Sequence, residues 1–191
     1  MKPSVSRRQI LLLAAAAARL RASGEDFWNR KPAAQWDVGE IYQLLNHSPW
    51  AHRAKWRLPS PSEVTKDTVK TVVTWESAQP VRDARKTSLA PVYENYYVIG
   101  VDGFPSGDNS PDELRQFAVL RSTGKAKWSV RAAASRERIR TSSVFQFAFP
   151  RASAPIGPDS QEVVLDINLR PWTLRTKFKP REMLYRGKLA L

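Results

Sequence analysis

The alternation of apolar and polar residues in the second half of the chain predicts β-strands. In "EVVLDINLR" four aliphatic side chains share one face while Asp166 and Asn168 lie on the other, and "SVFQFAFP" places three phenylalanines on one face. "AKWSVR", "TLRTKFK" and "LYRGKLAL" show the same period of two, and "RPW" (170–172) predicts a tight hairpin. Strands with one apolar face favour an antiparallel sheet that is solvated on one side.

The first half mixes helical and extended patterns. "QWDVGEIYQLLNHSP" predicts a helix that begins at a capping box of Asp37 and Glu40 and ends near His47, before Pro49. Its expected apolar face consists of Val38, Ile41, Tyr42 and Leu45. "SAQPVRDARKT" predicts a short polar helix, and "SPDELRQFA" predicts another with Leu114, Phe117 and Ala118 inward.

Two strands are expected between these helices. "DTVKTVVTWES" alternates along one face, whereas "NYYVIGV" is apolar on both sides and is expected to be central in its sheet. Together the patterns predict one α+β domain over residues 24–191, mainly an antiparallel β-sheet, with a few short helices in the N-terminal half.

Residues 1–23 have the features of an export signal. "SRRQILL" (6–12) resembles a twin-arginine motif, and the apolar run at 10–18 matches the ~7–15 residues of a signal core, whereas a membrane helix needs about 20. Two cleavage positions remain open, after Ala18 and after Ala22. We therefore expect a periplasmic or secreted protein with no transmembrane span once the signal is removed.

The chain offers few residues for catalysis or metal binding. It has no cysteine and only two histidines, His47 and His52, whose spacing of five and intervening Pro49 keep them off one helical face. No G-x-S-x-G nucleophile motif is present. We expect no catalytic residues, no cofactor and no metal site.

The charge balance suggests a class of partner. The net charge is +13, and the five basic residues and no acid of the leader leave +8 on the mature chain. Outside the cytoplasm such an excess favours anionic envelope polymers or lipid headgroups over nucleic acid, and another secreted protein is a further candidate. In "TLRTKFKPR" the side chains of Arg175, Lys177 and Lys179 project to one side as a candidate anion-binding row, although cations on an exposed strand also protect sheet edges from aggregation.

The aromatic content has two interpretations. Seven tryptophans are present, and Trp50 and Trp56 follow the first predicted helix. Packing in the core of a disulfide-free domain is the first interpretation. A surface on which sugar rings stack, including Trp50 and Trp56, is the second.

Several phrases together resemble a known protein family. They are "DFWNRKPAAQWDVGEIYQLLNHSPWA", "TVVTWESAQPVRDA", "YYVIGVDGFP", "VFQFAFPR" and "KFKPREMLYRGKLAL". The chain resembles a family of secreted proteins of unassigned function found mainly in acidobacterial genomes. The resemblance implies export and a single domain, and it carries neither an activity nor functional residues. Ala190 stands where the family's ending has a glutamate.

The function expected from the sequence is therefore that of an exported, non-catalytic envelope protein with a binding or structural role. The alternative is a secreted hydrolase that acts on envelope polymers.

We predict that Arg7→Lys combined with Arg8→Lys prevents export. The change keeps both charges but removes the paired guanidinium groups of the twin-arginine motif. Fractionation of cells that express the full chain measures the periplasmic share. A double variant that is exported as well as the parent contradicts the twin-arginine interpretation.

Overall fold

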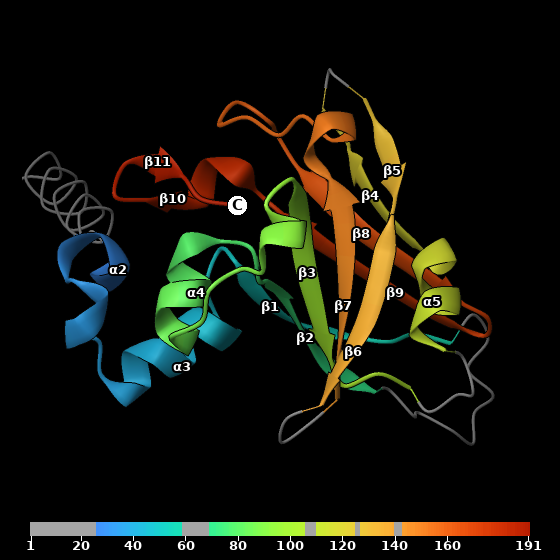
Figure 1. Ribbon diagram of the computed structural model, residues 1–191, viewed down its shortest axis with the longest axis horizontal. Helices are drawn as coiled ribbons and strands as arrows, with labels where there is room; N and C mark the ends of the chain where they lie inside the picture. The colour runs from blue at the N-terminus through green and yellow to red at the C-terminus, as the bar shows by residue number, and fades with distance from the viewer. Residues whose placement is uncertain (1–25, 59–68, 106–109, 125–126, 140–142) are drawn as a thin grey trace, which may run out of the picture.

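The computed structural model describes residues 26–58, 69–105, 110–124, 127–139 and 143–191. The expected export signal, residues 1–23, lies outside them. The strands form two antiparallel sheets and a small hairpin (Figure 1).

The strands of the larger sheet run in the order β1-β2-β3-β7-β6 and come from both halves of the sequence. They are β1 (Ala51–Lys55), β2 (Lys70–Trp75), β3 (Tyr96–Asp102), β7 (Ser143–Pro150) and β6 (Ala134–Ile139). The smaller sheet has the order β5-β4-β8-β9 and contains β5 (Ser129–Arg131), β4 (Ala118–Ser122), β8 (Val163–Leu169) and β9 (Trp172–Phe178). The C-terminal hairpin pairs β10 (Leu184–Tyr185) with β11 (Lys188–Leu189).

The helices are short. The α-helices are α2 (Phe27–Arg30), α3 (Val38–Asn46), α4 (Gln79–Arg85) and α5 (Pro111–Leu114). Single 3-10 turns are η1 (Ala33–Gln35), η2 (Pro91–Tyr93), η3 (Arg115–Phe117), η4 (Arg151–Ser153) and η5 (Pro180–Glu182). In Figure 1, α3 and α4 lie on one side of the larger sheet and the smaller sheet lies on the other. The predicted α+β class, a single domain built mainly of antiparallel strands, is confirmed.

One hydrophobic core contains buried residues of both sheets and of the helices α2, α3 and α4. Trp75 on β2 packs edge-on against Tyr97 of β3 and Phe178 of β9, with ring centroids 5.5 and 5.1 Å apart. The tryptophans that are buried are Trp28, Trp36, Trp50, Trp56 and Trp75. Within the described residues these rings form T-shaped contacts with other aromatic rings, a geometry that adds to the gain from burial. Core packing thus explains most of the tryptophan content.

Several local predictions are confirmed. Asp37 and Glu40 form the capping box of α3, and Ser110 and Glu113 form that of α5. β3 is the central strand of its sheet, and Leu169 pairs with Trp172 across the predicted hairpin.

The buried face of α3 differs from the prediction. Val38 is 85% exposed and Tyr42 is 53% exposed, whereas Leu44 is fully buried and Ile41 and Leu45 are partly buried. The C-terminal turn, not the first turn, docks on the core, because the hydroxyl of Ser48 donates to the Leu44 carbonyl and Trp50 is buried directly after it.

The structure also differs from the prediction in the number and the limits of its strands. Residues 51–55 form a strand that was not predicted. Ala118 begins β4, whereas the prediction placed it in a helix. "LYRGKLAL" forms two short strands because Arg186 and Gly187, with φ of 51° and 73°, reverse the chain between them. β6 was not anticipated.

A buried carboxylate connects four elements of the larger sheet and its helical cover. Glu76, 7% exposed, follows β2 and accepts hydrogen bonds from Arg85 of α4, Arg138 of β6 and the Gln146 amide of β7. The Arg138 Nη2 atom lies 3.1 and 3.2 Å from the two carboxylate oxygens. The side chain lies directly over Gly100 of β3, where an added Cβ would be 2.5 Å from Oε1.

We predict that Gly100→Ala destabilises the protein by about 3 kcal/mol, because the new methyl group displaces the Glu76 carboxylate from its partners. Gly157→Ala is the matched control, since no atom lies within 4 Å of its Cβ position. Urea denaturation of both variants measures the effect. Equal free energies of unfolding for the two variants would show that the packing over Gly100 is not required.

Candidate anion-binding groove

The candidate site lies between the edge strands of the two sheets. β1 is at the end of the larger sheet and β9 is at the end of the smaller one. Arg57, just after β1, and Thr173 of β9 exchange two backbone hydrogen bonds, each 2.8 Å long. Among the described residues, no further ladder hydrogen bond joins the two edges, although β1 and β9 lie close together. We call the line along which they meet the seam.

A groove of about 1000 Å³ is lined by residues of β9, β1, β2 and the end of β3, and it is rich in basic side chains. One wall carries Arg53, Lys55, Arg57 and Lys70, and the other carries Arg175 and Lys177. All six residues are exposed. Of the described residues that line the groove, Asp102 is the one acid. Cations at every second position of β1 and β9 share a face because side chains alternate along a strand.

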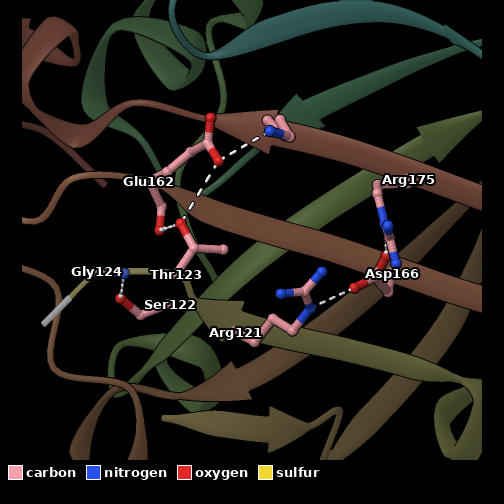
Figure 2. A network of polar contacts seen from close by, with 8 residues as sticks. Arg121, Ser122, Thr123, Gly124, Glu162, Asp166 and Arg175 are labelled. Carbon is pink, nitrogen blue, oxygen red and sulfur yellow. Dashed lines mark hydrogen bonds and ion pairs between the residues drawn. The ribbon is translucent and has the colours of Figure 1, made fainter. Parts of the chain in front are cut away.

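The cations of the β9 wall are paired with acids on the outer face of the smaller sheet. The Arg175 Nε atom lies 2.5 Å from Asp166 Oδ1, and the Arg121 Nε atom lies 2.6 Å from Asp166 Oδ2 (Figure 2). The Lys177 ammonium lies 3.0 Å from the Glu162 carboxylate. These exposed pairs are screened by solvent and contribute little to stability, so both cations remain accessible to a ligand.

The β1 wall is less neutralised. Among the described residues, no carboxylate forms an ion pair with Arg53, Lys55, Arg57 or Lys70. Arg53 donates a hydrogen bond to the Tyr42 hydroxyl, and its guanidinium carbon lies 6.0 Å from that ring's centroid. The excess positive charge of the groove therefore lies mainly on this side.

Two less exposed residues alternate with the groove cations and lie on the core-facing side of their strands. Thr176 of β9 is 5% exposed, and its hydroxyl has no hydrogen-bond partner among the described residues. His52 of β1 packs against the Phe178 ring with centroids 5.0 Å apart. Burial lowers the pKa of His52 below its usual 6.5, and Lys179 lowers it further, while Glu182 and a hydrogen bond with the Pro49 backbone oppose the change.

The structure brings together two of the three residues of the predicted row. Arg175 and Lys177 line the groove, whereas Lys179 lies outside it and pairs with Glu182 at 3.1 Å. The stacking role considered for Trp50 and Trp56 does not fit, because both rings are 0% exposed. Their indole N–H groups donate to the carbonyls of Ala190 and Gly103, at 2.7 and 3.0 Å.

Sequence reasoning missed the β1 wall. The alternation in "AHRAKWR" (51–57) puts Arg53, Lys55 and Arg57 on one side, but no strand was predicted after the helix that ends near His47. Within the ranges the structure describes, there is no group of three or more His, Asp or Glu side chains placed to hold a metal ion. Nor does any described helix have the length and apolar character needed to span a membrane.

Comparisons with protein-family models, with curated proteins and with solved structures gave no match to this chain.

We predict that His52 makes stability fall as the solution becomes acidic. Because the pKa of His52 is lower in the folded state, the unfolded chain binds the proton first as the pH falls. The contribution of neutral His52 to the free energy of unfolding is therefore complete above about pH 6.5 and is lost as the pH falls below that value. His52→Gln should reduce the drop in melting temperature between pH 7 and pH 5.5, because glutamine does not titrate. His47→Gln, on an exposed helix end, is the control. The same drop in the parent and in His52→Gln would contradict the assignment.

Proposed function

We propose that the protein is an exported, non-catalytic binding protein of the cell envelope that holds an anionic partner in the groove between β1 and β9. The observation that carries this proposal is the collection of six exposed cations around one groove with a single described acid, Asp102. Export rests on the leader sequence and on the family resemblance, and the mature excess of +8 agrees with an anionic partner.

The geometry suits an extended ligand better than a compact one. The cations line up in two rows along neighbouring strands, so a linear polyanion can contact several of them at once. Each exposed contact is weak alone, because charges are screened over about 8 Å at physiological ionic strength. Several contacts made by one chain give useful affinity through their high effective concentration. The hydrolase alternative gains no support from a specific contact among the described residues.

We predict that Arg53→Glu with Lys55→Glu weakens retention on a dextran sulfate column. The parent should bind at low salt, and the double variant should elute at markedly lower salt, because two groove cations that have no acid partner among the described residues become acids. Arg131→Glu with Lys188→Glu is the matched control, since it changes the net charge equally at exposed positions away from the groove.

The comparison of the two double variants decides the result. A large shift for the groove variant and a small shift for the control support the proposed function. Equal shifts would mean that retention follows net charge alone, and a parent that is not retained would reject the proposal altogether.

A further inference from the structure

Two lysines face each other across the ladder between β1 and β2. Lys55 is the register partner of Lys70, and both side chains are exposed and line the groove. The Trp56 N–H donates to the Val69 carbonyl, so residues 56 and 69 form a hydrogen-bonded pair and the neighbouring lysines form a non-hydrogen-bonded one. Side chains approach most closely in such a pair, with Cβ atoms about 4.5–5.5 Å apart, and like charges in these positions destabilise the sheet.

Further cations surround Lys55. Arg53 and Arg57 follow it and precede it by two residues on the same face of the extended chain, which corresponds to about 6.6–6.8 Å. β9 lies against the other side of β1, and Arg57 pairs with Thr173 there. Continued along both strands, this antiparallel register sets Arg175 beside Lys55. Lys55 is therefore at the centre of the groove's positive charge.

The acids near this cluster do not neutralise the two lysines. In the ranges that the structure describes, no carboxylate forms an ion pair with Lys55 or Lys70. Asp102 of β3 also lines the groove, but the β2–β3 register places it diagonal to Lys70 and not opposite it. Asp166 pairs with Arg175 on the outer face of the smaller sheet. A bound anion would remove the repulsion between the lysines.

We propose that Lys55, Lys70 and Arg57 bind one phosphate monoester group of the anionic partner. This inference rests on the proposed function, because it names the charged group that the groove recognises. A phosphate monoester carries a charge of about −1.5 to −2 at pH 7 and has three strong acceptor oxygens. Placed between the two lysines, it replaces their repulsion by two attractions. The Arg57 guanidinium can hold two of its oxygens at once.

The arrangement favours phosphate over a carboxylate. A carboxylate has a single negative charge, which balances only one of two directly opposed ammonium groups, and its two oxygens lie in one plane. A phosphate monoester balances both lysines and offers a third oxygen to the arginine. The same group occurs on sugars and on lipids, and these carriers are separated by the choice of probes.

The test compares two sugar acids that differ in their charged group. Glucose 6-phosphate carries a phosphate monoester at the position where glucuronate carries a carboxylate, and calorimetric titration at low salt gives both affinities. Flotation with phosphatidylcholine vesicles, with and without phosphatidate, tests a lipid carrier. Lys70→Glu places an acid opposite Lys55. Arg131→Glu is the matched control, because it makes the same change of charge at an exposed position of β5 opposite Val119.

We expect glucose 6-phosphate to bind the parent about tenfold more tightly than glucuronate does. Lys70→Glu should lose this binding and raise the melting temperature by about 1–3 °C, because an ion pair replaces two like charges. A variant that is more stable and binds less cannot owe its loss of binding to misfolding. Arg131→Glu should bind glucose 6-phosphate as the parent does.

Several results would overturn the phosphate site. They are equal affinity for the two sugar acids, unchanged binding by Lys70→Glu, or a lower melting temperature of that variant. Binding of phosphatidate vesicles, with or without binding of glucose 6-phosphate, supports the site and identifies a lipid carrier. If neither carrier binds, the site is rejected, and dextran sulfate then decides the rest: retention of the parent leaves the proposed function intact, and no retention rejects it as well.

Discussion

The buried carboxylate of Glu76 is the interaction on which the arrangement of the larger sheet depends. It joins β2 to α4, β6 and β7, and it fits only because β3 has a glycine beneath it. A buried acid without partners would cost several kcal/mol, so Arg85, Arg138 and Gln146 must all be held in place around it. The network thus fixes strands that are far apart in sequence, and it anchors the helical cover on the same face.

The groove is a consequence of how the two sheets meet. The Glu76 network and the contact between Trp75 and Tyr97 hold β2, β3, β7 and β6 together, and β1 is the outermost strand beside β2. β9 is outermost in the other sheet because the hairpin with β8 gives it one neighbour only. The aromatic core holds the two edges side by side, with His52 and Phe178 in contact, while a single backbone pair joins them. The lack of further hydrogen bonds between these two edge strands therefore results from the strand topology and not from a loop.

Local patterns in the sequence predicted most elements but not their pairing. Capping residues and period-two strands have local causes, so α3, α5, β3, β8 and β9 could be recognised from neighbouring residues alone. The division of the later strands between two sheets depends on long-range contacts such as Gly100 beneath Glu76, which leave no local pattern. Val38 and Tyr42 show the same limit, because both fit an apolar helix face and are exposed only through the way α3 docks. For the groove, the sequence pattern identified the cations of β9. The cations of β1 could not be assigned to the groove, because residues 51–55, which follow Pro49 and lie between two tryptophans, were not recognised as a strand.

Edge protection and ligand binding are compatible roles for the same cations. Charged side chains on an exposed edge prevent pairing with other copies of the chain, because two basic edges repel each other. The same cations attract a ligand of opposite charge, so edge protection is compatible with the anion binding that we propose. The distribution of acids supports this view: Asp166 and Glu162 pair with the cations of β9, whereas Arg53 and Lys55 lack acid partners among the described residues. Protection alone would be served by either arrangement, whereas cations that have no acid partner among the described residues are what the proposed anionic partner requires.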